Sequence, residues 1–332
     1  MQHFIGIDIG SSSCFAAVSN GLTPTGLPTL SFDNSAEGVT KFTDWLSSLG
    51  CTPKSSVICM ESCGVYAETV CYCLISGNWK IAVEPPHKIA RSMPANSAKT
   101  DISDARRIAC YAARYADELH FWTPPSEVIE HVTTLLALRE GYTRQSTALQ
   151  NQLHSIERKY IRTTEAETML RADIIRFKER IEELDKELKR WIDSDSSLKK
   201  MVESVDSVPG IGQTLAIYLL VITDCFRDGY SDRQLSAHLG IAPLDYQSGT
   251  SIWRKPRSRG FGHQTIRKLL YLGAMSAATH SKDLRPYYER LVAAGKNKRL
   301  VLNNIENKMI SIACALVRDE TVFSKNYVPT FK

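Results

Sequence analysis

Several patterns that would assign this chain to a familiar class are missing from its sequence. No Cys-x-x-Cys pair occurs among its nine cysteines, which argues against a structural zinc site and against a disulfide framework. No apolar run approaches the length of a membrane span, and the N-terminal segment lacks the basic and long apolar parts of a signal peptide. These absences predict a cytoplasmic protein with reduced, mostly buried thiols.

Proline is also absent between Pro125 and Pro209, and this gap divides the chain into three regions. Residues 1–125 alternate strand-like and helix-like patterns, which predicts an α/β domain around a central sheet. Residues 126–197 form a helical segment, and residues 198–332 form a mainly helical C-terminal domain. The strand-like runs cover 3–9, 14–19, 56–60 and 79–83, and the helix-like runs of the first region cover 39–49, 65–75 and 102–115.

Apolar residues recur every seven positions in the proline-free segment, which predicts two long helices with coiled-coil faces that fold back near residues 162–167. The recurring positions are Leu135, Tyr142, Leu149 and Ile156, followed by Ile174, Ile181 and Leu188, which are interleaved with Phe177, Leu184 and Trp191 at the other seam position. We expect these faces to join copies of the chain into a dimer or tetramer. A helix pair packed on its own domain is the alternative.

Positive charge is concentrated in one stretch of the C-terminal region. The net charge of the chain is only +5, but residues 248–300 contain twelve Lys or Arg against two acidic residues. This one-sided density predicts a phosphate-binding surface, although an ordinary solvated face could have the same composition. Gly210 and Gly212, in a Pro-Gly-Ile-Gly turn before an apolar helix, could present backbone N–H groups to a phosphate or could simply begin that helix.

Four carboxylates of the first region have the spacing of a metal site. Asp8 lies within an apolar strand, where a charge is costly to bury unless it binds something. Glu61 follows a second strand, and Asp101 and Asp104 share one face at the start of a helix. Oxygen ligands of this kind suit Mg²⁺ or Mn²⁺, and two such ions can activate the attacking oxygen and stabilise the leaving oxygen in phosphoryl transfer. Taken singly, Asp101 could be a helix N-cap and Glu61 a surface residue.

The opening Gly-Ile-Asp-Ile-Gly run also occurs in actin-like and sugar-kinase ATPases. Those proteins need a second Asp-Gly phosphate loop and a glycine-rich adenine segment. The later Asp-Gly pair of this chain, Asp228-Gly229, lies in the helical region, and the sequence contains no adenine segment. We therefore do not favour an ATPase.

The assembled pattern resembles the insertion sequence 110 family of transposases. Asp8 in GIDIG, Glu61 in MESCGVY, and Asp101 and Asp104 in KTDISDA fall where that family carries an Asp-Glu-Asp-Asp tetrad in a RuvC-like, ribonuclease H-like domain. Near the other end, SVPGIG, LSAHLGIAPLDYQSG and RSRGFGHQTIRKLLYLGA resemble the family's second domain. The sequence departs from the family at Phe261-Gly-His263, where a Lys/Arg-Gly-Asn turn is expected, which leaves the phosphate contacts of that turn open.

The resemblance implies a recombinase that cuts and rejoins DNA through a metal-bound tetrad and a nucleophilic serine. In this sequence that serine is Ser248, in a small-residue turn followed by a basic run. We expect nucleic acid to contact Gly210, Gly212, Arg254, Lys255, Arg257, Arg259, Arg267 and Lys268. The family also implies a guiding bridge RNA and a catalytic centre assembled between protomers.

Other functions remain open at this level. A site-specific DNA invertase shares the same motifs. A RuvC-like junction nuclease would use the tetrad without Ser248, and a non-catalytic nucleic-acid-binding dimer would use the carboxylates structurally. The sequence contains no convincing helix-turn-helix or zinc finger to read a target.

Overall fold

We describe the chain from a computed structural model, which defines residues 2–19, 26–92, 100–227, 231–248, 252–258 and 262–324. Along 244–248 and 252–257 the description is confined to the backbone. The chain divides into two compact units, Met1–Pro124 and Pro125–Lys332. Each unit has a hydrophobic core of its own.

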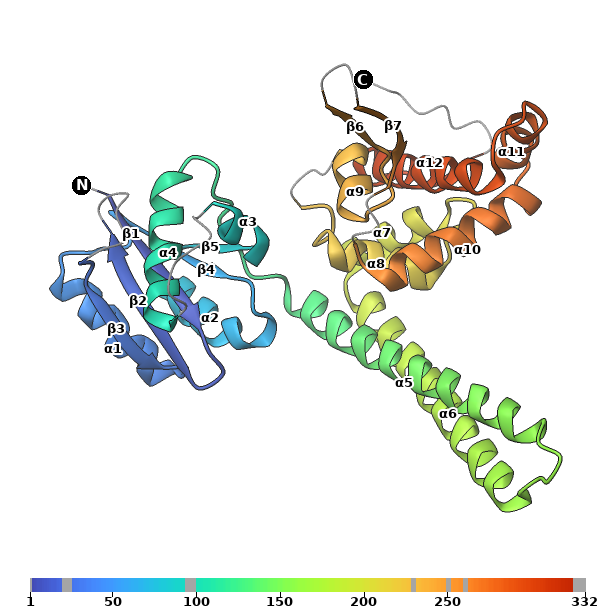
Figure 1. Cartoon of the computed structure of the whole chain (residues 1–332), viewed down its shortest axis with the longest axis horizontal. Coiled ribbons are helices and arrows are strands. Elements are labelled where there is room, and N and C mark those ends of the chain that lie inside the picture. Colours follow the sequence, from blue (N-terminus) through green and yellow to red (C-terminus); the bar gives the residue numbers. More distant parts are fainter. Residues whose placement is uncertain are drawn as a thin grey trace. The chain divides into compact units, whose positions relative to one another are not determined.

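The N-terminal unit is built on a five-stranded sheet with the strand order β3-β2-β1-β4-β5 (Figure 1). β2 lies antiparallel between β3 and β1, whereas β4 and β5 continue parallel to β1. The strands are β1 (His3–Ile9), β2 (Ser13–Ser19), β3 (Thr29–Asp33), β4 (Ser56–Glu61) and β5 (Lys80–Glu84). This mixed order confirms the predicted ribonuclease H-like, RuvC-like α/β fold.

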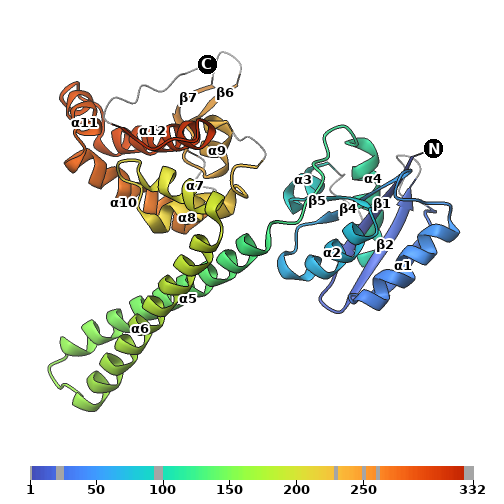
Figure 2. The same ribbon diagram turned by 180° about the vertical axis from the view of Figure 1, so that it is seen from behind.

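Helices cover both faces of this sheet. Ile5 and Ile7 are fully buried on one face, against α1 (Ala36–Ser48) and α2 (Glu68–Ser76), which lie in front of the sheet in Figure 2. The opposite face packs against α4 (Asp101–Arg114). Because neighbouring strand residues point to opposite faces, the alternate residues of β1 face α4.

Two elements of this unit were not predicted from the sequence. β3 is a short edge strand that has one buried residue, Phe32, and therefore lacks a clear apolar run. The helix α3 (Pro86–Arg91) begins where Pro85-Pro86 suggested only a strand end. Proline is tolerated in the first turn of a helix, because the N–H that it lacks has no partner there in any case.

The C-terminal unit begins with an antiparallel helical hairpin formed by α5 (Glu127–Glu157) and α6 (Thr164–Ser194). Three contacts define its direction: His131 meets Trp191 at 4.0 Å between rings, Arg139 Nε lies 2.5 Å from an Asp185 oxygen, and Tyr142 meets Phe177 at 5.6 Å between rings. The predicted pair of long helices that folds back on itself is therefore confirmed.

The apolar seam of the hairpin is filled within one chain. Leu188 and Ile192 of α6 are buried in the same core as Val132 and Leu136 of α5. This packing favours the alternative of a helix pair packed on its own domain, and the joining of two copies through the seam stays a prediction. The exposed apolar residues of the hairpin lie elsewhere, chiefly Tyr160 in the connection between the two helices.

The remainder of this unit is mainly helical, as predicted. The helices are α7 (Ser196–Asp206), α8 (Gln213–Ile222), α9 (Asp232–His238), α10 (Gln264–His280), α11 (Leu284–Ala293) and α12 (Lys298–Arg318). An unpredicted two-stranded hairpin, β6 (Leu244–Ser248) and β7 (Ile252–Arg257), lies between α9 and α10 in the chain. Neither strand has an apolar run, and β7 contains a proline, Pro256, which is uncommon inside a strand, so the sequence patterns did not indicate them.

Helix α12 is long and apolar enough to cross a membrane by length and composition alone. Within the described ranges it is the one helix of which this is true. The sequence reading had recognised no run of this length. Half of its apolar stretch is buried inside the protein. Val301, Ile305 and Met309 are fully enclosed by the rest of the unit. Amphipathic burial of this kind is typical of a core helix, and we assign α12 to the domain core.

Candidate active site

Asp8 and Glu61 lie side by side at one edge of the N-terminal sheet. β1 and β4 are parallel, and their register pairs Ile7 with Met60, so the next residue on each strand is one of these two carboxylates. Both side chains are partly buried. The fold therefore places the two acids at the ends of neighbouring strands.

Helix α4 approaches the same edge with its N-terminus. A Cβ placed on Gly6 would lie 2.2 Å from the carbonyl oxygen of Ala105, so β1 and the first half of α4 are packed backbone to backbone. Cys110, farther along α4, is hydrogen-bonded with Ser19, which pairs with Phe4 near the start of β1. The helix thus runs opposite to β1, and its first turn lies toward the carboxyl end of that strand.

The first turn of α4 carries the other two predicted ligands. Thr100 is the N-cap, and its hydroxyl accepts a hydrogen bond from the Ser103 backbone N–H at 3.2 Å, while the Thr100 backbone N–H donates to the Ser103 hydroxyl oxygen at 3.0 Å. The capping function that Asp101 could have had is therefore performed by Thr100. Asp101 is exposed, and Asp104 forms an ion pair with Arg107 at 3.0 Å.

The thiols of Cys63 and Cys14 lie close enough to the carboxylates at this edge for their pKa values to be affected. Burial raises the pKa of the Cys63 thiol, and the charges of Asp8 and Glu61 raise it further against one backbone hydrogen bond. Burial also raises the pKa of Cys14 to about 11, with smaller contributions from Cys63 and Asp8. The charges of Asp8 and Glu61 thus act on the same thiol, that of Cys63, which places the two carboxylates in one neighbourhood.

Asn34 connects the loops that follow the two carboxylate-bearing strands, and the sequence reading missed it. Its amide nitrogen donates to the carbonyl of Gly10, just after β1, at 2.9 Å. The same nitrogen donates to the carbonyl of Tyr66, after β4, at 2.8 Å. A single side chain therefore holds the two loops together, and no local sequence pattern marks it, because both of its partners are distant along the chain.

Glu84 is a further acidic residue at this edge that the sequence reading missed. It pairs in register with Glu61 across β4 and β5, and its side chain is only 3% exposed. Lys88 balances its charge through an ion pair of 2.9 Å, which explains how a carboxylate can be buried here. Its position directly after the strand-like run 79–83 and directly before Pro85 repeats the pattern of Glu61 and could have identified it.

The residues present fit a hard divalent ion by their chemistry. All four predicted ligands supply carboxylate oxygen, which Mg²⁺ and Mn²⁺ prefer. Among residues 2–19, 26–92 and 100–124, no three acidic, histidine or cysteine side chains come close enough to hold one metal ion. The backbone thus brings the strand ends and the start of α4 to one edge, and the side chains are not closed around a common point.

Ser248 is the last residue of β6 and pairs in register with Ile252 of β7. The same hairpin pairs Tyr246 with Arg254 and Leu244 with Arg257, so the basic run lies along the strand opposite the serine. The side chains of Ser248, Arg254, Lys255 and Arg257 lie outside the described part of the structure, and Arg259 lies outside the described residues altogether.

The other predicted nucleic-acid contacts differ from one another. Lys268 is exposed on α10, whereas Arg267 is partly buried and its charge acts on the buried carboxyl of Glu306. Burial raises the pKa of Glu306, against hydrogen bonding by Asn303 and the charge of Arg267. Arg267 therefore faces the interior of its unit as well as the surface.

Gly210 and Gly212 also have separate roles. Gly210 has a φ of +94°, which favours glycine, and lies against the backbone of Gly273 in α10. Gly212 is the N-cap of α8, has a φ of −106° and has open space where a Cβ would lie. Gly210 is thus explained by packing, and the expectation of a phosphate contact fits Gly212 better.

All nine cysteines are free in the described structure, and five of them are buried.

Comparison with known proteins places these features in one family. A family model described as a transposase, of the Asp-Glu-Asp-Asp type of IS110, matches residues 5–160. A second model, described as the transposase IS116/IS110/IS902 family, matches residues 202–289. The two matches include the four carboxylates and the Ser248 hairpin, respectively.

Relatives extend over almost the whole chain. A pilin gene-inverting protein of Moraxella lacunata is 26% identical, with 97% of this chain and 98% of that protein covered. A transposase for the insertion sequence element IS1328 of Yersinia enterocolitica is 25% identical, covering 69% of this chain and 75% of that protein. The Thermus thermophilus RuvC structure matches 36% of this chain and all of its own, at 13% identity and a TM-score of 0.27. On the two successive family matches, this chain belongs to the IS110 family of transposases.

Proposed function

We propose that this transposase cuts and rejoins DNA with Asp8, Glu61, Asp101 and Asp104 as ligands of divalent metal and Ser248 as the nucleophile. The observation that carries the proposal is the position of Asp8 and Glu61 at the ends of adjacent parallel strands, with the first turn of α4 at the same edge. Acidic residues on three separate elements therefore lie at the same edge of the sheet, and such a concentration of charge is a candidate functional site.

Mg²⁺ or Mn²⁺ bound by these residues would supply charge stabilisation for the attacking and leaving oxygens of a phosphodiester. The protein's own part is to fix the ligands. Asn34 ties the loops after β1 and β4, and the contact between Gly6 and Ala105 sets the height of α4 above the sheet. Such second contacts commonly alter metal affinity or activity by about 10–100-fold when lost.

The serine step conserves the energy of the DNA backbone. The Ser248 oxygen attacks phosphorus, loses its proton to solvent or to the departing oxygen, and forms a phosphoserine ester as the bond to that oxygen breaks. Attack of a DNA hydroxyl on the ester then restores a phosphodiester and returns the proton to the serine, so rejoining needs no ATP. Arg254, Lys255 and Arg257 on the opposite strand of the hairpin, and Arg259 after it, would stabilise the charge of the pentavalent transition state.

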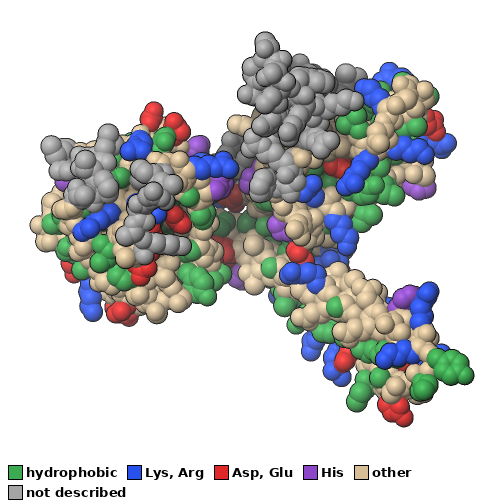
Figure 3. All heavy atoms as spheres, viewed as in Figure 1, with side chains coloured by type: hydrophobic (Ala, Val, Ile, Leu, Met, Phe, Trp, Pro, Cys, Tyr) green, Lys and Arg blue, Asp and Glu red, His purple; other side chains and the backbone are tan. Residues whose placement is uncertain are grey.

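We propose that several copies assemble, because the proposed catalytic groups belong to different units of the chain. The carboxylates belong to the N-terminal unit and Ser248 to the C-terminal unit. We propose that the hairpin connection joins protomers in a dimer or tetramer. Tyr160 and Ile161 there are 102% and 81% exposed, and hydrophobic side chains gather at this end of the hairpin in Figure 3.

A guide is the remaining part of the proposal. The chain carries the basic stretch 248–300 but no recognisable base-reading module in its sequence, so target choice needs another component. Family likeness points to a bridge RNA that pairs with donor and target DNA. As a DNA enzyme with free thiols, the protein would act in the cytoplasm.

A site-specific invertase is the second candidate. The specific observation in its favour is that the pilin gene-inverting protein aligns with the chain from end to end. A RuvC-like junction nuclease is the third, and it would have no use for Ser248.

One experiment separates the three candidates. Purified protein, with the RNA that copurifies, is given Mg²⁺ and a plasmid carrying two inverted copies of its own element ends, and the products are trapped on a denaturing gel. Inversion with a covalent protein–DNA band indicates an invertase, and excision with the same band indicates a transposase. Junction cleavage without a covalent band would overturn the serine proposal.

A further inference from the structure

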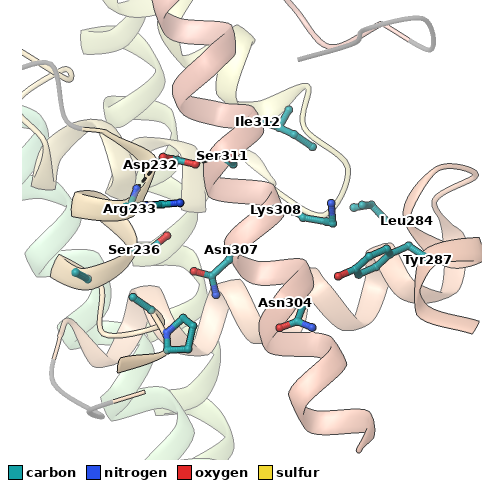
Figure 4. A pocket seen from close by; sticks show the side chains of 13 residues that line it. Asp232, Arg233, Ser236, Leu284, Tyr287, Asn304, Asn307, Lys308, Ser311 and Ile312 are labelled. Carbon is teal, nitrogen blue, oxygen red and sulfur yellow. Dashed lines mark hydrogen bonds between the residues drawn. The ribbon is translucent and has the colours of Figure 1, made fainter. Parts of the chain in front are cut away.

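The C-terminal unit contains a cavity that none of the predicted site residues lines. It measures about 1040 Å³ and is formed by α9, α11, α12 and the segment Ala242–Pro243 before β6 (Figure 4). Pockets for small ligands commonly enclose about 300–1000 Å³, so this space can hold more than one small group. We propose that it binds an unpaired segment of a nucleic-acid strand, an inference that rests on the proposed function in DNA recombination.

One wall of the cavity is a polar stripe on α12. The stripe lies on one face of the helix, as Figure 4 shows, because residues three or four positions apart are neighbours on a helix surface. Its members are Asn304, Asn307, Lys308 and Ser311. The opposite face of α12 is buried in the core. The stripe is thus held rigidly, and its polar groups are presented to the cavity without any cost in ordering the helix.

The charge of the lining favours a phosphate. Arg233 on α9 and Lys308 on α12 are both exposed, and the Lys308 ammonium lies 4.7 Å from the ring centre of Tyr287. The acidic residue of the lining is Asp232, and both of its oxygens are engaged. One oxygen accepts from the backbone N–H of Arg233 at 2.9 Å, and the other accepts from the Ser311 hydroxyl at 2.6 Å. Two cations therefore meet one carboxylate that already has partners.

Amide groups in the lining favour the edge of a base. The nitrogen of Asn307 donates to the carbonyls of Ile241 at 3.2 Å and Asn303 at 2.8 Å, which fixes the side chain and leaves its oxygen to accept. Asn304 has no side-chain hydrogen bond within the described part of the chain and keeps both donors and acceptor. Asparagine amides match the donor and acceptor on the Watson–Crick edge of a nucleobase, and that edge is exposed only when the base is unpaired.

Apolar lining residues complete this chemistry. Leu284, Ile312 and Pro243 give the cavity a surface against which the flat face of a base can pack. An acidic peptide would use the cations but not the combination of amide pairs and flat apolar surface. The mixed lining is therefore better matched to a nucleotide than to a carboxylate side chain.

The cavity is also close to the proposed nucleophile along the chain. Pro243 directly precedes β6, which ends at Ser248, and five residues of extended strand span at most about 17 Å. A strand whose phosphate reaches Ser248 can therefore place neighbouring nucleotides in the cavity. We infer that the site holds the unpaired bases next to the cut, so that the end stays bound while strands exchange.

Anisotropy of fluorescein-labelled single-stranded DNA and RNA oligonucleotides of one sequence tests the proposal on the full chain, in EDTA so that the metal site takes no part. Lys308→Glu and Asn304→Ala should each weaken binding about tenfold or more, because contacts to one base or its phosphate are commonly of that size. Lys178→Glu, an exposed substitution of the same charge on α6, is the matched control. Thermal unfolding checks that each variant is folded.

The arms of the test have distinct meanings. A loss for DNA alone identifies the cut strand as the occupant, and a loss for RNA alone identifies the guide. A loss for both supports a site that reads bases without regard to the sugar. Affinities equal to that of Lys178→Glu, or equal losses for duplex and single strands, would overturn the proposal. Because the assay contains no metal and measures binding alone, a failure of the cleavage proposal is recognised separately.

Discussion

Gly210 and Gly273 meet backbone to backbone: a Cβ placed on Gly210 would lie 2.5 Å from the Gly273 carbonyl oxygen. Gly210→Ala should therefore destabilise the C-terminal unit by about 1–3 kcal/mol, through overpacking and through strain at its positive φ. Gly212→Ala is the matched control, because open space surrounds that position. Chemical denaturation measures both, and equal stability of the two variants would contradict this packing.

The carboxylates should be needed for cutting and not for folding. Asp8→Asn or Asp104→Asn removes a charged ligand while keeping the side chain's shape, so Mg²⁺-dependent cleavage should fall by about hundredfold or more. Asp44→Asn, an exposed position on α1, is the control. Cleavage is assayed on labelled DNA, with circular dichroism to verify the fold. Wild-type rates for both site variants would exclude the proposed metal site.

Ser248 should carry the covalent link. Ser248→Ala should bind DNA with unchanged affinity but leave no protein–DNA band on a denaturing gel, because the ester cannot form. Ser258→Ala, the exposed serine after β7, should behave as wild type. If the band persists in Ser248→Ala, another nucleophile is at work.

Two substitutions in the helical hairpin should affect different properties, one the stability of the fold and the other the assembly of copies. Leu188 is 2% exposed, so Leu188→Ala should cost about 2–5 kcal/mol of stability by leaving a cavity. Ile161 is 81% exposed, so Ile161→Glu should leave the melting temperature almost unchanged while dividing the assembly into smaller species. Calorimetry and light scattering record the two quantities. An unchanged mass for Ile161→Glu would exclude the hairpin connection as the contact between protomers.

The network around Glu140 should make the stability of the C-terminal unit depend on pH. Burial alone would raise the pKa of Glu140, but hydrogen bonds from Thr265 at 2.6 Å and Tyr218 at 3.0 Å, with the charges of His263 and Arg144, lower it below its ordinary 4.5. A lowered folded-state pKa means that this stabilisation is present above pH 4.5 and is lost as the pH falls through the folded-state value.

Glu140→Gln should remove that dependence and cost about 1–3 kcal/mol at neutral pH. Melting temperatures of the two proteins should converge as the medium is acidified from neutral. Parallel curves over the whole range would show that Glu140 does not contribute in its ionised form.

The sequence predicted the elements whose patterns are local. Apolar runs identified β1 and β4, heptads identified α5 and α6, and the carboxylates fell at the expected element ends. The partner of a heptad seam was not local information, because the same spacing serves a helix within the chain or in another copy. Glu84 and Asn34 were missed for a related reason: their roles come from strand register and from loops distant in sequence.

Asn34 also sets a chemical lifetime for the carboxylate edge. Its amide nitrogen donates to two carbonyl oxygens, those of Gly10 and Tyr66, so the connection depends on one C–N bond in a side chain followed by Ser35. Slow spontaneous hydrolysis of that amide to a carboxylate would replace the donor by a negative oxygen facing two acceptors, which repel it. The loops after β1 and β4 would then separate, and ageing of the protein would inactivate its proposed cutting chemistry before it unfolded the sheet.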